Sequence, residues 1–308
     1  EKEILWLIAT MFNQLNDQMI SPELKDVLKL KYLNLNDIFG VKGIFQFQIS
    51  EPGSIRELVP LNMGLVDLTL FDLPELKFIW KGPKNFLSLQ MLGMIYVNGC
   101  PKLKTIFSPT ILRSLPMLNT LRITNCQELE HIFDSGDAQE LKCLYTCSQQ
   151  VCFTNLKWIE VQNCNNLKCL FYNFVAGHFP SLVKLDIEEC SQLEKVFAFE
   201  HEADDDGQEG TGKDGEQVLL CNLTYITFTS LPNFKEIHHG FKLTDQVEQT
   251  ITDCPEYAAS LYLYPGKTLM SFFQAQLLCL GSHCKVKYYF IMKFYVKLCS
   301  MTKSSHKS

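Results

Sequence analysis

Residues Leu118–Phe133 read LNTLRITNCQELEHIF, and this stretch decides the fold. Its apolar positions follow the spacing L-x-x-L-x-L-x-x-C-x-x-L-x-x-I-F. Around Leu121 and Ile123 the apolar residues alternate with others, and a period of two sends both side chains to one face of a short strand. From Cys126 onward the apolar residues recur at every third position, which suits a turn with one side facing inward. The stretch therefore predicts a short strand and a turn that share one buried side.

The same spacing occurs six more times, starting at Leu30, Leu65, Leu92, Leu156, Leu182 and Leu223. Successive first leucines are 35, 27, 26, 38, 26 and 41 residues apart, so the basic period is about 26. One copy cannot bury its apolar side alone, so neighbouring copies must stack around a shared core. This spacing is typical of leucine-rich repeats, and the alternation within it disfavours amphipathic helices. We predict an α/β solenoid, a leucine-rich-repeat horseshoe with a parallel sheet on its concave face and irregular turns or short helices on its convex face.

The repeats predict three regions. Residues 1–29 are apolar but do not fit the spacing, and we expect an N-terminal cap or a truncated repeat there. Residues 30–245 form the solenoid of about seven repeats, with insertions at 46–60, 134–150 and 198–218. From about Val247 the spacing fails, so we expect a poorly defined tail over 246–308. That tail is apolar and basic. The favoured interpretations are a poorly packed terminal cap or sequence that functional relatives do not share, and contact with an anionic membrane surface is the alternative.

Charge and cysteine usage restrict the partner and the compartment. The formal net charge is −6, but residues 200–216 alone carry −7, so the rest of the chain sums to +1. That balance gives no indication of nucleic acid as a partner. The chain has 13 cysteines, an odd number, and several occupy the buried Cys position of the repeat, such as Cys126 and Cys164. This usage favours free thiols in a reducing compartment over a disulfide framework, and we expect a cytoplasmic protein.

No motif in the chain argues for catalysis, a cofactor or a metal. Gly207–Asp214 nearly matches a phosphate-binding loop, but Asp214 lacks the hydroxyl that would hold magnesium and the flanking acids would repel a triphosphate. Cys143, Cys147 and Cys152 lack the pairing or the histidines that zinc sites use. The pair at 238–239 is interpreted as turn histidines. We therefore expect no enzyme, no cofactor and no metal site.

The informative surface is the solvent-facing side of the predicted sheet. Strand residues between the ladder positions point outward, and stacking aligns them in columns. The central column reads Asn34, Thr69, Tyr96, Arg122, Glu160, Asp186 and Thr227. Aromatic, Met and Arg residues are favoured in binding hot spots. Glu160, Asp186, Glu188 and Glu189 make the later part of the face acidic, which suits a partner with a basic patch. The candidate partner-binding residues are Phe71, Met94, Tyr96, Arg122, Trp158, Glu160, Lys184, Asp186, Glu188 and Tyr225; the alternative is that each is an ordinary solvated sheet residue.

Three phrases of the sequence closely resemble the C-terminal repeats of plant coiled-coil nucleotide-binding leucine-rich-repeat (NLR) disease-resistance proteins. They are LPELKFIWKGP at 73–83, LRITNCQELEHIF at 121–133 and FPSLVKLDIEEC at 179–190. The resemblance covers roughly residues 24–240. It implies protein partners: a pathogen effector, or a host protein that effectors modify, and the nucleotide-binding switch domain that such repeats hold inactive.

The resemblance leads to the first hypothesis, that the chain is a non-enzymatic recognition module in plant immunity. The chain lacks the switch domain, which puts signalling by this chain alone in doubt. A second hypothesis is a substrate adaptor of a ubiquitin ligase, which would need an F-box-like segment upstream. A third is a truncated remnant without independent activity, suggested by the failure of the spacing after Val247.

Overall fold

The computed structural model describes residues 28–46, 61–81, 87–107, 111, 115–133, 153–172, 179–198, 220, 222–237 and 246–257. The chain divides into two compact units, residues 1–263 and 264–308, and every described residue belongs to the first unit. Almost all of the expected N-terminal cap and of the three insertions lies outside the described residues, as does the expected tail from residue 258 onward.

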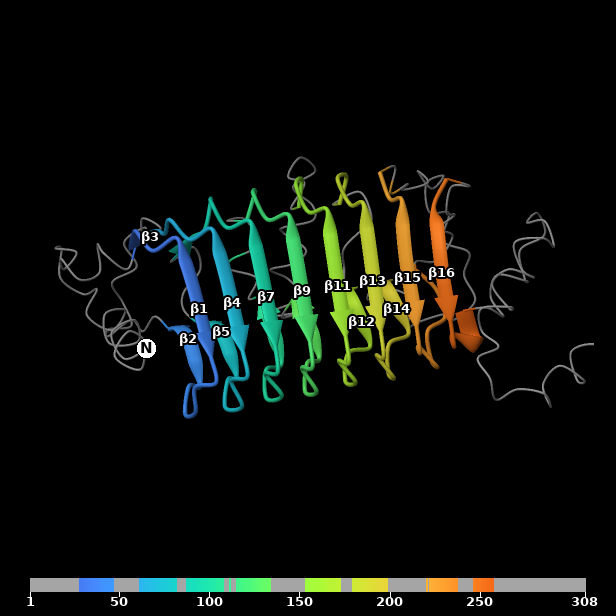
Figure 1. The fold of residues 1–308 in the computed structure, drawn as a ribbon, viewed down its shortest axis with the longest axis horizontal. Helices are drawn as coiled ribbons and strands as arrows, with labels where there is room; N and C mark the ends of the chain where they lie inside the picture. Colours follow the sequence, from blue (N-terminus) through green and yellow to red (C-terminus); the bar gives the residue numbers. More distant parts are fainter. Residues whose placement is uncertain are drawn as a thin grey trace, which may run out of the picture. The chain divides into compact units, whose positions relative to one another are not determined.

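Eight parallel strands lie side by side in one sheet (Figure 1). In spatial order they are β1 (Tyr32–Asn36), β4 (Asp67–Phe71), β7 (Met94–Asn98), β9 (Thr120–Thr124), β11 (Trp158–Gln162), β13 (Lys184–Glu188), β15 (Tyr225–Thr229) and β16 (Glu248–Thr252). The first seven are the L-x-L segments of the seven repeats. Each repeat contributes one strand next to that of the preceding repeat, which confirms the predicted solenoid with its parallel sheet.

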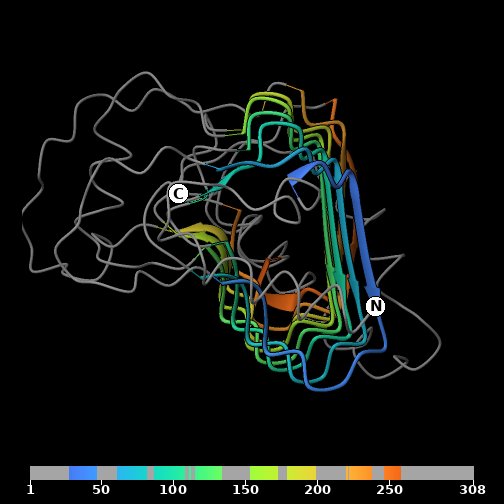
Figure 2. The same cartoon turned by 90° about the vertical axis from the view of Figure 1, so that its left-hand side faces the viewer.

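Short strands occupy another side of each coil, and successive coils overlie one another when viewed along the stack (Figure 2). The pairs on this side are β2 (Gly43–Gln46) with β5 (Phe78–Lys81), β8 (Thr105–Phe107) with β10 (His131–Phe133), and β12 (Cys169–Tyr172) with β14 (Lys195–Ala198). A fourth pair, β3 (Leu61–Asn62) with β6 (Leu87–Ser88), comes before the large-sheet strand of its repeat, and not after it. Most of them contain the I-F end of the repeat spacing. In the described part of the chain, this side therefore carries short strands, whereas the sequence analysis expected irregular turns or short helices.

The core runs unbroken along the stack. From Leu65 to Ile237, every described side chain at a position of the repeat spacing is buried. A further buried column, outside the quoted spacing, stands three residues before the first leucine of five repeats: Leu89, Leu115, Phe153, Phe179 and Leu220. In each case the leucine amide donates to the carbonyl of this residue over 3.1–3.3 Å, so the column also closes the turn that enters the strand.

A left-handed residue ends each strand of the sheet. Asn125 and Asn163, directly after β9 and β11, have φ of 56° and 52°. This conformation turns the amide of Asn125 toward the next strand, where it donates to the Gln162 carbonyl over 3.0 Å. Short polar residues tolerate positive φ better than most others, and the same position elsewhere holds Asp, Ser, Glu or Gly. The backbone ladder thus continues one residue past the strands.

The Cys position of the repeat forms a column of buried thiols. The Sγ of Cys164 donates to the Gln162 carbonyl over 3.4 Å and to the Ile123 carbonyl of the preceding repeat over 4.0 Å. Cys190 repeats the arrangement one coil further on. A thiol fits because it is small and donates weakly to carbonyls that the turn leaves exposed to the core. None of the described cysteines forms a disulfide.

The sheet extends past residue 245, where the sequence analysis placed the end of the solenoid. Strand β16 pairs with β15 in register, with Ile251 opposite Phe228. Cys254 takes the buried thiol position, and Tyr257 packs its ring edge-on to Phe228 at 5.5 Å. The spacing loses its match here because Gln249 stands opposite Ile226, where the earlier strands carry an aliphatic residue, and because Tyr257 replaces the leucine that normally follows the Cys. Tyr257 is buried in place of that leucine, and the eighth strand joins the sheet.

Candidate functional site

The outward face of the eight-stranded sheet carries the candidate residues, and its columns are those that the sequence predicted. In the central column, Tyr96 pairs with Arg122, Arg122 with Glu160, and Glu160 with Asp186. The strands β4, β7, β11 and β13 alternate half-buried and buried residues, so the half-buried side chains are the ones that face outward. Stacking therefore places polar and aromatic side chains of successive repeats in direct contact.

Arg122 is the centre of this face. Its guanidinium lies 4.8 Å from the ring centroid of Tyr96 and 5.4 Å from that of Trp158. Its Nη2 donates to Oε1 of Glu160 over 3.0 Å, and this hydrogen bond raises the pKa of Arg122 above its usual value. Rings on neighbouring strands and a carboxylate together fix a long side chain that would otherwise be free to move.

The contacts continue in both directions from Arg122. On one side, Phe71 packs edge-on against Tyr96 with 4.7 Å between centroids. On the other, Nζ of Lys184 lies 4.9 Å from the Trp158 ring centroid and 2.6 Å from Oδ2 of Asp186. We call Phe71, Tyr96, Arg122, Trp158 and Lys184 the aromatic–cation cluster. It crosses five strands, β4 to β13, as one continuous set of ring and cation contacts.

Acidic groups gather beside the cluster on β11 and β13. Glu160 and Asp186 are paired and only 18% and 13% exposed. Glu188 has no cationic partner in the described part of the chain, and its pKa is raised by burial and by the nearby carboxylates of Asp186 and Glu189. This end of the face therefore carries negative charge that its own lysine only partly neutralises.

Glu188→Gln is expected to stabilise the fold at neutral pH by up to about 0.5 kcal/mol, since solvent still screens this half-buried side chain. The pKa of Glu188 is higher in the folded than in the unfolded chain, so the native state holds the proton more tightly. The cost of the charged form is present at neutral pH and disappears as pH falls through the folded pKa. Urea denaturation at pH 7 and below pH 4 would measure this. An equal difference between variant and parent at both pH values would contradict the assignment.

Buried polar atoms without a partner concentrate on this face. The described residues contain four buried side-chain nitrogen or oxygen atoms with no hydrogen bond, and three of them are Nε of Arg122, Nε1 of Trp158 and Oδ1 of Asp186. Each such atom costs free energy, and native structures tolerate few of them. Three of the four atoms therefore lie in or beside the aromatic–cation cluster.

Seven of the ten candidate residues are joined by direct contacts: Phe71, Tyr96, Arg122, Trp158, Glu160, Lys184 and Asp186. Glu188 is close enough to Asp186 for that carboxylate to raise its pKa, and its Oε2 lies 3.5 Å from Nε2 of Gln162. Met94 and Tyr225 stand in the same column as Trp158, and Tyr225 is 49% exposed, but no ring or ionic contact links either of them to the cluster. The repeat spacing predicted the columns, but it did not indicate which neighbouring side chains touch.

The other candidates of the sequence analysis fall mainly outside the described residues, namely the phosphate-loop-like segment, Cys143, Cys147 and Cys152, the histidine pair and the basic part of the tail. Within the described part of the chain, no His, Cys, Asp and Glu side chains group in a way that could hold a metal ion. No helix among the described residues has the length and apolarity needed to cross a bilayer.

A family model described as plant disease resistance protein RPS2-like, leucine-rich repeats, matches residues 3–127 and again residues 128–243. No curated protein matches the chain significantly. The family match covers the described sheet up to β15 and spans well over half of the chain. The repeat spacing, the parallel stack and this match agree, and the chain belongs to the leucine-rich repeats of RPS2-like plant disease resistance proteins.

Proposed function

We propose that this chain is the recognition region of an intracellular plant immune receptor and that it binds a protein partner through the aromatic–cation cluster. The observation that carries the proposal is the continuous set of contacts from Phe71 to Lys184, in which buried polar atoms lack partners. Aromatic and Arg side chains that are already fixed in place lose little conformational entropy when a partner covers them, so they make good binding anchors. The buried thiol column supports a reducing compartment such as the cytoplasm.

The partner is a pathogen effector or a host protein that effectors modify. Its contact surface is basic, because Glu188, Glu189 and the free oxygen of Asp186 leave unneutralised negative charge beside the cluster. A lysine or arginine of the partner would pair with Glu188 and remove the electrostatic cost of its charged form. Aromatic rings of the cluster supply the apolar centre of the interface, and the carboxylates supply its polar rim.

Binding acts on a switch domain through a conformational equilibrium. The repeats favour the closed form of a nucleotide-binding domain, and the partner binds better to the open form. To move such an equilibrium from 1:99 to 99:1, the partner must bind the open form about 10⁴-fold more tightly, a difference of about 5.5 kcal/mol. A compact anchor region of several hot-spot side chains reaches that magnitude.

Replacing Tyr96, Arg122 and Trp158 together by alanine tests the proposal. The three side chains are half-buried on the sheet surface, so the variant is expected to fold, which thermal unfolding checks. In a full-length RPS2-like receptor that carries these repeats, the variant is expected to lose the effector-triggered cell-death response or to become active without effector.

The matched control removes two aromatic side chains and one cation outside the cluster: Tyr32, Phe39 and Lys168, all exposed. This control is expected to respond as the parent does. Unchanged recognition together with unchanged autoinhibition in the cluster variant would rule out the sheet face as the site.

A further inference from the structure

A second surface of the stack, away from the sheet face, carries an ordered column of charge. In every repeat a charged residue directly follows the apolar residue that stands three positions after the Cys position. In successive coils these charged residues are Lys42, Lys77, Lys104, Glu130, Lys168, Glu194 and Lys235. Backbone hydrogen bonds join neighbours of the column: the amide of Lys77 donates to the Lys42 carbonyl over 2.9 Å, and that of Glu130 to the Lys104 carbonyl over 3.0 Å. The order of charges along the column is therefore fixed by the fold.

From Lys104 onward the lysines and glutamates of the column neutralise one another. Nζ of Lys104 lies 2.7 Å from Oε1 of Glu130, and Nζ of Lys235 lies 2.7 Å from Oε2 of Glu194. Lys168 stands between the two glutamates in the stack, so lysine and glutamate alternate through these five coils. Opposite charges on neighbouring positions of a parallel ladder attract each other, which is the arrangement expected of a surface that only needs to be soluble and stable.

The first coils break this alternation. Lys42 and Lys77 are consecutive members of the column, both exposed, and neither has an ion-pair partner among the described residues. Like charges on directly opposed positions are destabilising. The positive field reaches neighbouring groups: the pKa of Glu75 is lowered first by its hydrogen bond from Lys102 and also by Lys42 and Lys77.

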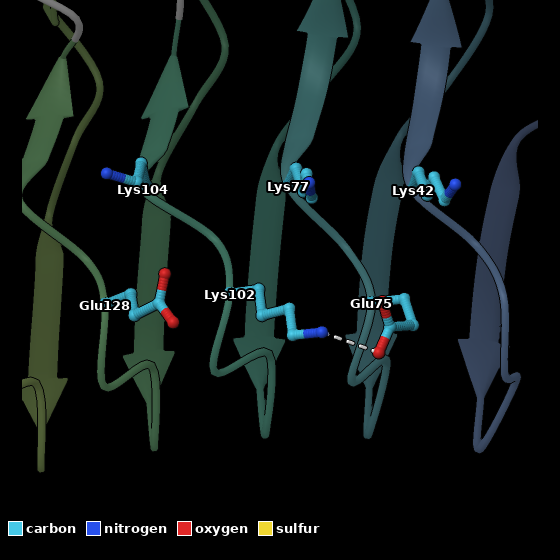
Figure 3. A pocket seen from close by; sticks show the side chains of 6 residues that line it. All are labelled: Lys42, Glu75, Lys77, Lys102, Lys104 and Glu128. Carbon is cyan, nitrogen blue, oxygen red and sulfur yellow. Dashed lines mark hydrogen bonds and ion pairs between the residues drawn. The ribbon is translucent and has the colours of Figure 1, made fainter.

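These lysines line a groove of about 380 Å³ (Figure 3). Its other lining residues are Lys102, which lies 2.7 Å from Glu75, and Glu128. Figure 3 shows Lys42, Lys77 and Lys104 in one row and Glu75, Lys102 and Glu128 in a second row beside it. Four ammonium groups thus face two carboxylates, and the excess of positive charge lies at the Lys42 and Lys77 end.

We propose that this groove, defined by Lys42, Glu75, Lys77, Lys102, Lys104 and Glu128, docks an acidic segment of a polypeptide. Neighbouring coils are about 4.8 Å apart, so Lys42 to Lys104 spans roughly 10 Å, the length of about three extended residues. Carboxylates on such a segment pair with Lys42 and Lys77. The carboxylates of Glu75 and Glu128 disfavour a compact polyphosphate or a nucleic acid, whereas a peptide can place amide or cationic donors beside them.

The docking segment is separate from the partner of the sheet face, because the two surfaces carry opposite charge. The sheet face has unneutralised carboxylates on β13, and the groove has unneutralised ammonium groups beside β2 and β5. A receptor domain or partner with an acidic strand or tail therefore fits the groove and does not fit the sheet face.

The test measures binding of a fluorescein-labelled peptide of alternating Glu and Asp residues to the full chain by fluorescence anisotropy. The parent is expected to bind this peptide more tightly than a peptide with Gln and Asn in the same places, and salt is expected to weaken the binding. Lys42→Glu with Lys77→Glu is expected to weaken binding at least tenfold. Thermal unfolding checks that this variant folds.

Lys168→Glu is the matched control, since Lys168 occupies the same position of the repeat in a later coil and is also exposed. It is expected to change peptide affinity less than twofold. Three results would each overturn the proposal: equal binding of the acidic and neutral peptides, an equal loss with Lys168→Glu, or displacement of the peptide by inositol hexakisphosphate or single-stranded DNA at lower concentration than by unlabelled acidic peptide.

Discussion

Phe179→Ala is expected to lower the free energy of unfolding by about 3–5 kcal/mol, the cost of removing a large aromatic side chain from a packed core. Phe179 is completely buried. Its ring is stacked on that of Phe153 in the preceding repeat at 5.4 Å, and it meets the rings of Phe171 at 4.6 Å and Phe197 at 5.6 Å. The cavity left by the substitution would lie between two coils, and the ring contacts that join them would be lost.

A stack without distant contacts is sensitive to this substitution. Each repeat contacts only its neighbours, so a weakened interface is not supported from elsewhere in the fold. The two halves of the sheet on either side of Phe179 are therefore expected to separate into two unfolding transitions, or the single transition to broaden. Urea denaturation followed by circular dichroism measures the midpoint and the cooperativity.

Phe39→Ala is the control for the loss of an aromatic ring, because Phe39 is 71% exposed. Its effect is expected to stay within about 0.5 kcal/mol, as for most surface substitutions. If Phe179→Ala cost less than about 1 kcal/mol, the packing of the aromatic residues between β11 and β13 would be contradicted.

The buried thiols are expected to react with iodoacetamide at least about a thousandfold more slowly in the native chain than in urea. Cys100, Cys126, Cys164 and Cys190 are fully buried. Burial also raises the pKa of the Cys100 thiol to about 12, so little reactive thiolate is present near pH 8. Labelling then requires opening of the stack, whose free energy sets the rate.

Peptide mapping by mass spectrometry resolves this reaction residue by residue. Cys169, on β12, is only partly buried and serves as the internal reference that reacts earlier. Equal labelling of Cys169 and Cys164 in the native chain would contradict the burial of the thiol column.

The local spacing of apolar residues was enough to predict several features of the fold. The L-x-L segment can bury both apolar side chains only as a strand, and the copies can bury their shared side only by stacking. The strand residues and the three outward columns followed from this, as did the thiol position. The eighth strand was harder to find, because Gln249 and Tyr257 stand at positions where the spacing expects aliphatic residues. The column containing Phe179 was missed for another reason: it precedes the quoted spacing.

Contacts within the surface could not be derived from the spacing. The sequence placed Arg122 in the central column but gave no reason for it to lie between Tyr96 and Trp158, with Glu160 as its partner. These contacts depend on which side-chain conformations the neighbouring repeats leave room for. The same holds for the groove: Lys42 and Lys77 are 35 residues apart in the chain, and only the stack places them side by side.

The sequence by itself determined the repeat, the parallel sheet and the identity of the columns, because burial of regularly spaced apolar side chains is a local requirement repeated many times. The tertiary structure alone decided which side chains of a column touch, which charges of the described residues remain unpaired and that an eighth strand joins the sheet. Those outcomes depend on distances between separate coils, and a distance between coils is set by packing across the whole core and not by the spacing within any one repeat.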